Sequence, residues 1–353
     1  MNPRLNSLWP VVWLSTAVIL AAGISLSAAP ADSGLTVRAG AIVFNRPAFD
    51  TAALVEFPFV LTRDQFDFYR PDSASPSLFA RIFAQVNVYG ADGRAIDSAN
   101  TYFSAGATDS ADALKPDYSL FNSLVVVARP GVYSARVTVI DVVSKREGSC
   151  FLDRINVDPP VKDRLSMGGK CLAFRIAYVG EAPGVVVGVP KNGYEVRVNP
   201  TGVFSTHDTT AAYYAEAYSL KFDPRAPSEF VVTTVVLDDS SRVVRELGSR
   251  SRTKAGTSAV IAESFSIRGL TPGLYVLQVT VADRDSGEEI SHDFPFAIVS
   301  PLKPAESMQP AVSGSDDPCA ALDLETQRRL VYYLLVGQEK EIFKRLSPEG
   351  QRL

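Results

Sequence analysis

The sequence is poor in the residues from which most catalytic and metal sites are built. Its 353 residues include two histidines, three cysteines and three methionines. No His or Cys pair stands at zinc-ligand spacing, and neither histidine accompanies a Gly-x-Ser-x-Gly nucleophile turn. The sequence therefore offers no catalytic, cofactor-binding or metal-binding residues and favours a protein that is not an enzyme.

An excess of charge of one sign is also missing. The chain has 35 Lys and Arg against 39 Asp and Glu, a formal net charge of −4. Phosphate binding needs a surplus of Lys and Arg, so this balance argues against nucleic acid as the main partner.

The N-terminal residues have the order of a secretory signal peptide. Arg4 precedes an apolar run from Trp9 to Leu26, and small residues follow up to Ala31. We predict cleavage after Ala31, which places residues 1–31 outside the mature fold. The alternative is an uncleaved membrane anchor, because an apolar run of this length just spans a bilayer.

One sequence word occurs twice and indicates a structural unit that is built twice. Residues 130–141 and 272–283 both read Pro-Gly-x-Tyr-x-x-x-Val-Thr-Val-x-Asp. A repeat at such a long period identifies the architecture, and the chain is long enough for two domains with separate cores. In both copies the residues that alternate after Tyr133 and Tyr275 predict a strand with one buried face.

Each unit also carries a hairpin pattern. Strand formers at 78–89 lead into Gly-Ala-Asp-Gly at 90–93 and a return at 94–97, and the same order recurs at 230–237, 238–241 and 242–245. We therefore predict an all-β fold of two tandem immunoglobulin-like or fibronectin-like β-sandwiches, at 34–158 and 171–300. Pro159-Pro160 and Gly168-Gly169 separate them.

Each repeated Tyr is expected to close its sandwich. A Tyr at the start of a strand, just after a Pro-Gly turn, places its ring in the core and its hydroxyl on backbone of the connecting loop. Trp9 and Trp13 are the only tryptophans, and both precede Ala31. The mature chain thus lacks the buried Trp of true antibody-type and fibronectin-type domains.

After the second unit the pattern changes. Residues 301–318 are rich in Pro and Ser and predict a flexible linker, and residues 319–353 have helical spacing. This short α-helical tail presents apolar side chains for a protein partner at Leu330, Leu334, Phe343 and Leu346. Ser347-Pro348-Glu349 is a helix-start signal, so we expect the natural chain to continue past Leu353.

The cysteines allow two interpretations. Cys150 and Cys171 would close a disulfide loop of about twenty residues worth about 3 kcal/mol in an oxidising compartment. Three unpaired thiols are the alternative, since pairing does not follow from sequence alone.

The titratable residues give weak candidates. His207 lies in a polar loop, and His292 beside Asp293 is compatible with a hydrolase relay, but surface histidines are favoured for lack of a nucleophile. Residues 283–289 begin like a calcium loop and lack its later ligands, which favours a strand-to-strand turn.

Two surface features would suit a glycan. The basic residues of 242–254 fit an edge strand protected by charge or a site for an acidic glycan or lipid headgroup; they are Arg242, Arg245, Arg250, Arg252 and Lys254. In the strand at 213–218, Tyr214 and Tyr218 share a face with Glu216, and Tyr213 points the other way. If these tyrosines are exposed, their rings would stack on sugars. The favoured interpretation is that the tyrosines divide between the core and a cross-strand pair on the surface.

The chain resembles the exported GWxTD-domain proteins of bacteria. The residues that carry the resemblance are 55–57, 129–133, 198–200, 214–220, 329–334 and 339–349, although the Gly-Trp-x-Thr-Asp word itself is not in this chain. The resemblance implies an envelope location, in the periplasm or at the cell surface, and no established activity. We expect a non-enzymatic exported protein with a structural, adhesion or spacer role. The alternative is a carbohydrate-binding module of a larger envelope enzyme.

The signal-peptide prediction has a direct test. If residues 1–31 are removed on export, fractionation of cells that express the full chain should place a protein beginning near Asp32 outside the membrane pellet. A mature protein that still carries Trp9 and Trp13 in the pellet would show an anchor instead.

Overall fold

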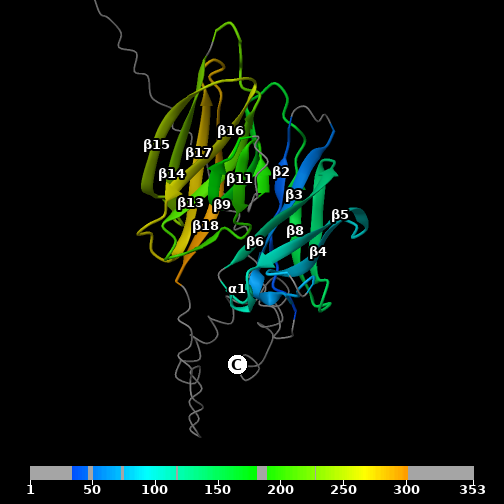
Figure 1. Cartoon of the computed structure of the whole chain (residues 1–353). Helices are drawn as coiled ribbons and strands as arrows, with labels where there is room; N and C mark the ends of the chain where they lie inside the picture. The colour runs from blue at the N-terminus through cyan, green and yellow to red at the C-terminus, as the bar shows by residue number, and fades with distance from the viewer. Residues whose placement is uncertain are drawn as a thin grey trace, which may run out of the picture. The chain divides into compact units, whose positions relative to one another are not determined.

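The computed structural model describes residues 34–46, 51–72, 75–116, 118–180, 189–226 and 228–300, and these belong to one compact unit. The predicted signal peptide, linker and helical tail all lie outside these ranges. The described chain is almost entirely β-strand, arranged in four sheets that we name A to D (Figure 1). None of its helices is long and apolar enough to cross a bilayer.

Sheets A and B form the first sandwich. Sheet A has the order β1-β3-β2, with β6 on the other edge of β3; its strands are β1 (Arg38–Ala39), β2 (Ile42–Phe44), β3 (Ala53–Thr62) and β6 (Ser119–Ala128). Sheet B has the order β5-β4-β7-β8; its strands are β4 (Leu78–Tyr89), β5 (Ala95–Ala107), β7 (Gly131–Asp141) and β8 (Glu147–Val157). The 3-10 turn η1 (Arg63–Gln65) and the short helix α1 (Ser110–Ala113) connect strands.

Sheets C and D form the second sandwich. Sheet C has the order β10-β11-β9-β13-β16; its strands are β9 (Ser166–Tyr178), β10 (Val189–Lys191), β11 (Tyr194–Val198), β13 (Thr210–Tyr218) and β16 (Ser258–Ser266). Sheet D has the order β12-β18-β17-β14-β15; its strands are β12 (Val203–Ser205), β14 (Glu229–Asp238), β15 (Val243–Thr253), β17 (Gly273–Asp283) and β18 (Glu289–Val299).

The all-β prediction is confirmed, and so is the repeat. Strands β5-β4-β7-β8 of sheet B and β15-β14-β17-β18 of sheet D have the same order and pair antiparallel throughout. Both predicted hairpins are present, and Gly93 (φ 76°) supplies the positive φ of the first turn. Each sandwich has its own apolar core, one spanning Leu35 to Val157 and the other Leu165 to Ile298.

Both tyrosine corners form as predicted. The Tyr133 hydroxyl donates to the Arg129 carbonyl, and the Tyr275 hydroxyl donates to the Thr271 carbonyl, each over 2.8 Å. The alternating residues that follow each Tyr on β7 and β17 face inward and are fully buried, among them Val137 and Val279. The repeated word therefore specifies the strand that closes each sandwich.

The second sandwich starts earlier than residue 171, the predicted boundary. Leu165 and Met167 belong to its core, and Gly168-Gly169, expected to be a separator, lies inside β9. Glycine is needed there because Gly169 has a φ of 63° and a Cβ at this position would lie 2.4 Å from the Phe44 ring. Residues 158–165 form the strand-free connection between β8 and β9.

The corner predicts a specific stability loss. Tyr275 is 8% exposed and stacks on Phe296, with ring centroids 5.4 Å apart. Tyr275→Ala should lower the free energy of unfolding by about 3–5 kcal/mol through the lost ring. Tyr275→Phe, which removes only the hydroxyl, should cost about 1 kcal/mol. Denaturant unfolding measures both, and a Tyr275→Ala protein as stable as the parent would contradict the corner assignment.

Candidate functional site

The outer face of sheet C is buried against the first sandwich. Ile42 and Phe44 of β2 pack on side chains of β9, β11 and β13 in an apolar cluster of their own; its other buried members are Cys171, Ala173, Val196, Val198, Ala212 and Tyr214. Sheet C is therefore covered on both faces. This explains why β13, with the sequence Thr-Ala-Ala-Tyr-Tyr-Ala-Glu-Ala-Tyr, is almost entirely buried.

One carboxylate collects the polar groups of this interface. Glu216 of β13 is 5% exposed and accepts from the Tyr214 and Tyr218 hydroxyls over 2.8 and 2.7 Å. Asn192 Nδ2 donates to the same carboxylate over 2.8 Å, and Arg46 of the first sandwich donates through NH2 and Nε over 3.0 and 3.1 Å. We call these five residues the Glu216 cluster.

In the Glu216 cluster the carboxylate faces one guanidinium and two phenols that keep their protons. Burial, followed by the negative charge of Glu216, raises the pKa of Tyr214 and Tyr218 well above the ordinary range of a phenol. Both hydroxyls thus stay protonated and act as donors to the carboxylate. With five donated hydrogen bonds, Glu216 has no lone pair left to serve as a catalytic base.

A second ion pair joins the sandwiches nearby. Lys191 of β10 donates to Glu56 of β3, and each side chain is 5% exposed. The Lys191 ammonium also lies 5.4 Å from the centroid of the Phe44 ring, and the Arg46 guanidinium lies 5.5 Å from it. Phe44 is thus held between two cations that each pair with a buried acid.

A cleft of about 820 Å³ opens beside the Glu216 cluster. Arg46, Glu216 and Tyr218 line one part of it, and Lys221, Ser286 and Glu288 line another. Several of its charged groups already have partners, since Glu288 accepts from the Leu165 backbone N–H and the Lys221 ammonium donates to the Asp285 carbonyl.

The last residue of the repeated word has a role that the sequence did not reveal. Asp141 and Asp283 are 0% and 1% exposed. Each caps its own turn, accepting from the backbone N–H two residues on, at Val143 and Asp285. Asp141 also accepts from the backbone N–H of Asp67 over 2.8 Å, and Asp283 accepts from that of Lys221 over 2.7 Å. Both donors follow a strand of the opposite sheet. In both sandwiches this carboxylate thus ties sheet to sheet.

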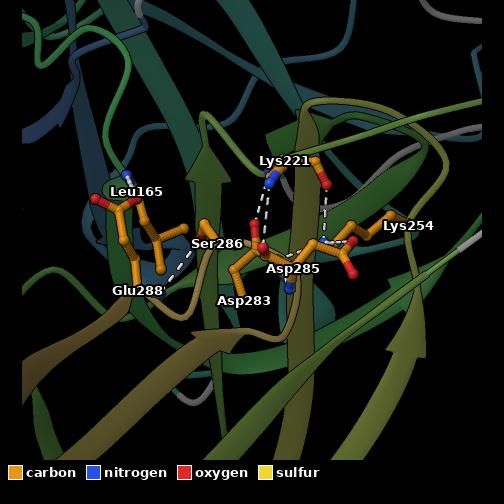
Figure 2. A network of polar contacts seen from close by, with 7 residues as sticks. All are labelled: Leu165, Lys221, Lys254, Asp283, Asp285, Ser286 and Glu288. Atoms are coloured by element: carbon orange, nitrogen blue, oxygen red, sulfur yellow. Dashed lines mark hydrogen bonds and ion pairs between the residues drawn. The ribbon is translucent and has the colours of Figure 1, made fainter.

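In the second sandwich a lysine completes this tie, as Figure 2 shows. The Lys254 ammonium contacts the carboxylates of Asp283 and Asp285 and donates to the Lys221 carbonyl over 2.8 Å. Burial alone would raise the pKa of Asp283, but the Lys254 ammonium and the two backbone donors outweigh it and hold that pKa below its usual range. Residues 284–288 form a turn, as predicted, with the ammonium between the acids. No cluster of metal-ligand type was found in the described ranges.

The histidines do not form a relay. His292 pairs across the strands with the core residue Val279, whereas Asp293 pairs with Gln278 on the outer face and accepts from it over 3.1 Å. His292 Nδ1 instead lies 2.8 Å from the Lys170 ammonium. Burial and this cation lower the pKa of His292 to about 4. His207 is exposed, as predicted.

The basic stretch covers the edge strand β15 and its two flanking residues, and it has partners within the chain. Arg242 pairs with Asp238 and Arg252 with Glu263, while Arg245 donates to the Ser266 and Arg268 carbonyls. These contacts favour the edge-protection interpretation over a phosphate or sulfate site.

Two other sequence hypotheses have structural outcomes. Tyr213, Tyr214 and Tyr218 are at most 4% exposed, so none of them presents a ring to a sugar, and the hypothesis of an exposed strip is wrong. The first sandwich covers Tyr214 and Tyr218, so neither belongs to a cross-strand pair on the surface.

The two cysteines of the described ranges are both free thiols. Cys150 lies in the first sandwich and Cys171 in the interface, where burial raises the pKa of Cys171 to about 12.

Comparisons with known proteins are weak. No family model and no curated protein matches the chain. Among solved structures, a β-glucuronidase of Bacteroides uniformis matches with 11% identity and a TM-score of 0.21, covering 70% of this chain and 26% of its own length. The serine-rich repeat protein Srr2 of Streptococcus agalactiae matches with 8% identity and a TM-score of 0.21, covering 80% of this chain and 96% of its own.

Both likenesses are at low identity and low TM-score. The chain spans about a quarter of the glucuronidase, since the coverage is 26%. At TM-scores near 0.2 neither match carries an argument about activity or ligand.

The Asp283 tie predicts acid-sensitive stability. Because its pKa is lower in the folded than in the unfolded chain, Asp283 stabilises the fold above pH ~4 and loses that effect as the pH falls through the lowered pKa. Asp283→Asn should cost about 3 kcal/mol at neutral pH, because the buried Lys254 keeps only Asp285 as an acidic partner, and should flatten the acid limb of a stability–pH profile. Asp239→Asn, in an exposed turn, is the matched control and should change neither. An unaltered acid limb in Asp283→Asn would contradict the assignment.

Proposed function

We propose that the chain is a non-enzymatic exported protein whose two β-sandwiches act together as a rigid spacer or adhesion unit. The observation that carries the proposal is the interface between them. It joins an apolar cluster to two ion pairs whose acids are buried, Arg46–Glu216 and Lys191–Glu56.

Such an interface resists bending for an electrostatic reason. Separating the sandwiches would leave Glu216 and Glu56 without their cations. A small displacement that breaks the ion pairs without admitting water would leave a buried acid uncompensated, at a cost of several kcal/mol. The observed arrangement pairs both acids and covers Phe44, and a fixed arrangement is what a spacer requires.

Export and partner binding belong to the same proposal. The apolar run after Arg4 and the resemblance to exported GWxTD-domain proteins support an envelope location. The apolar side chains of residues 319–353 are the proposed partner element, so deletion of that segment should abolish partner capture while the sandwiches stay folded.

The interface predicts that its ion pairs can be removed without unfolding either sandwich. A variant with Arg46→Ala and Lys191→Ala should keep both sandwich cores, because neither residue belongs to them. The loss of both cations should replace one cooperative melting transition by two and widen the small-angle scattering envelope.

The control for this variant is Arg242→Ala, which removes an exposed ion pair of the β14–β15 hairpin and should leave both measurements unchanged. A single transition and an unchanged scattering curve in the double variant would overturn the rigid-spacer proposal.

A further inference from the structure

The side chains that point outward from sheet B form rows across its four strands. Cross-strand partners share a face, and the inward residues of β4 and β7 are buried. One outward row contains Tyr102, Phe83, Ile140 and Glu147; the next contains Asn100, Gln85, Thr138 and Ser149; the third contains Ser98, Asn87, Arg136 and Phe151.

The first row exposes an aromatic pair. Tyr102 of the edge strand β5 is 67% exposed, and its ring lies 4.8 Å, centroid to centroid, from that of Phe83. Phe83 is half-buried and holds the Tyr102 ring in place at an interplanar angle of 50°. The pair thus offers a supported ring face to the solvent.

The second row, which we call the amide row, consists wholly of uncharged hydrogen-bonding groups. Asn100, Gln85, Thr138 and Ser149 stand side by side over about 14 Å, the span of four paired strands. Within the described ranges, the Asn100, Thr138 and Ser149 side chains make no hydrogen bond to the protein, and Gln85 makes one long contact to Asn87 of 3.4 Å. Their donors and acceptors are open to a ligand.

The equivalent row of sheet D shows that such groups need not stay open. There the hydroxyls satisfy one another, Thr233 with Ser249 and Thr280 with Ser291, each over 2.7 Å. No aromatic side chain lies beside them in the neighbouring cross-strand pairs. The repeat therefore supplies the same frame twice, and only the first copy combines free amides with an exposed ring.

A sugar has the complementary chemistry. A pyranose has an apolar C–H face that packs on an aromatic ring, and hydroxyls around its rim that pair with carboxamides. Since the amide row carries no charge and the two flanking rows carry only Glu147 and Arg136, the face suits an uncharged sugar chain. The amide row separates the apolar side chains of the two flanking rows, so the face has no contiguous apolar patch of the kind that marks many protein interfaces.

We propose that the outer face of sheet B binds a neutral polysaccharide, with Tyr102 stacked on a sugar ring and Asn100 and Gln85 bonded to its hydroxyls. This gives the first sandwich a ligand of its own, at a place distinct from the buried tyrosines of β13, and it does not depend on the rigidity of the interface.

Affinity electrophoresis of the mature chain tests the site, in native gels that contain dextran, mannan, galactomannan or xyloglucan, with heparin as the anionic probe. At least one neutral polysaccharide should retard the parent. Tyr102→Ala should weaken that retention by about tenfold, Asn100→Ala should weaken it less, and Tyr102→Phe should keep it.

The matched control is Tyr178→Ala. Tyr178 is 73% exposed and in edge contact with Tyr194 at 5.2 Å, but it lies on sheet C, away from the amide row. Its loss should leave retention unchanged. Retention by heparin alone, no retention by any neutral polysaccharide, or equal retention of the parent and Tyr102→Ala would each overturn the proposal. The Arg46→Ala, Lys191→Ala variant should still bind, which separates this site from the spacer role.

Discussion

The carboxylate of Glu216 is the group on which the arrangement of the described chain depends. Its strand, β13, is buried on both faces, so its one acid cannot reach bulk water and must be paired. Two phenols and an amide of the second sandwich supply part of the pairing, and among the described residues its cation is Arg46 of the first sandwich. The first sandwich thus both buries Glu216 and supplies its counter-charge. Burial and pairing arise together at the interface.

Within each sandwich another carboxylate has the corresponding task. Asp141 and Asp283 end the repeated word and join the turn after β7 or β17 to backbone beyond the opposite sheet. The two sites differ in what completes them. Asp141 takes only backbone and Ser144 donors, whereas Asp283 also takes the Lys254 ammonium. One structural solution has therefore been kept in both copies, with different charges around it.

The charged groups of the chain and its open hydrogen-bonding groups have different roles. Most of the chain's charged groups that sequence patterns made conspicuous are paired within the chain, as the arginines of β15 illustrate. Tyr214 and Tyr218 are buried with Glu216 at the interface, whereas Tyr213 is buried in the core of the second sandwich. The groups left open to a ligand are instead plain ones, an edge-strand tyrosine and a row of amides and hydroxyls, which carry no motif. The proposed spacer would have its two halves fixed by internal contacts and an outer sheet face free.

The sequence alone determined the number of sandwiches, their hairpins and the tyrosine corners, because strand alternation, Asp-Gly turn chemistry and Pro-Gly-x-Tyr act within a few residues of one another. It did not determine the start of the second sandwich, since the fit of Gly169 against Phe44 joins residues far apart in the chain. It also contained a signal for the interface, a single acid in each otherwise apolar strand, Glu56 in β3 and Glu216 in β13. Which cations meet these acids, and which tyrosines end up covered, only the tertiary structure decided. Pairing across domains depends on where two separate sheets meet, and local periodicity carries no information about that.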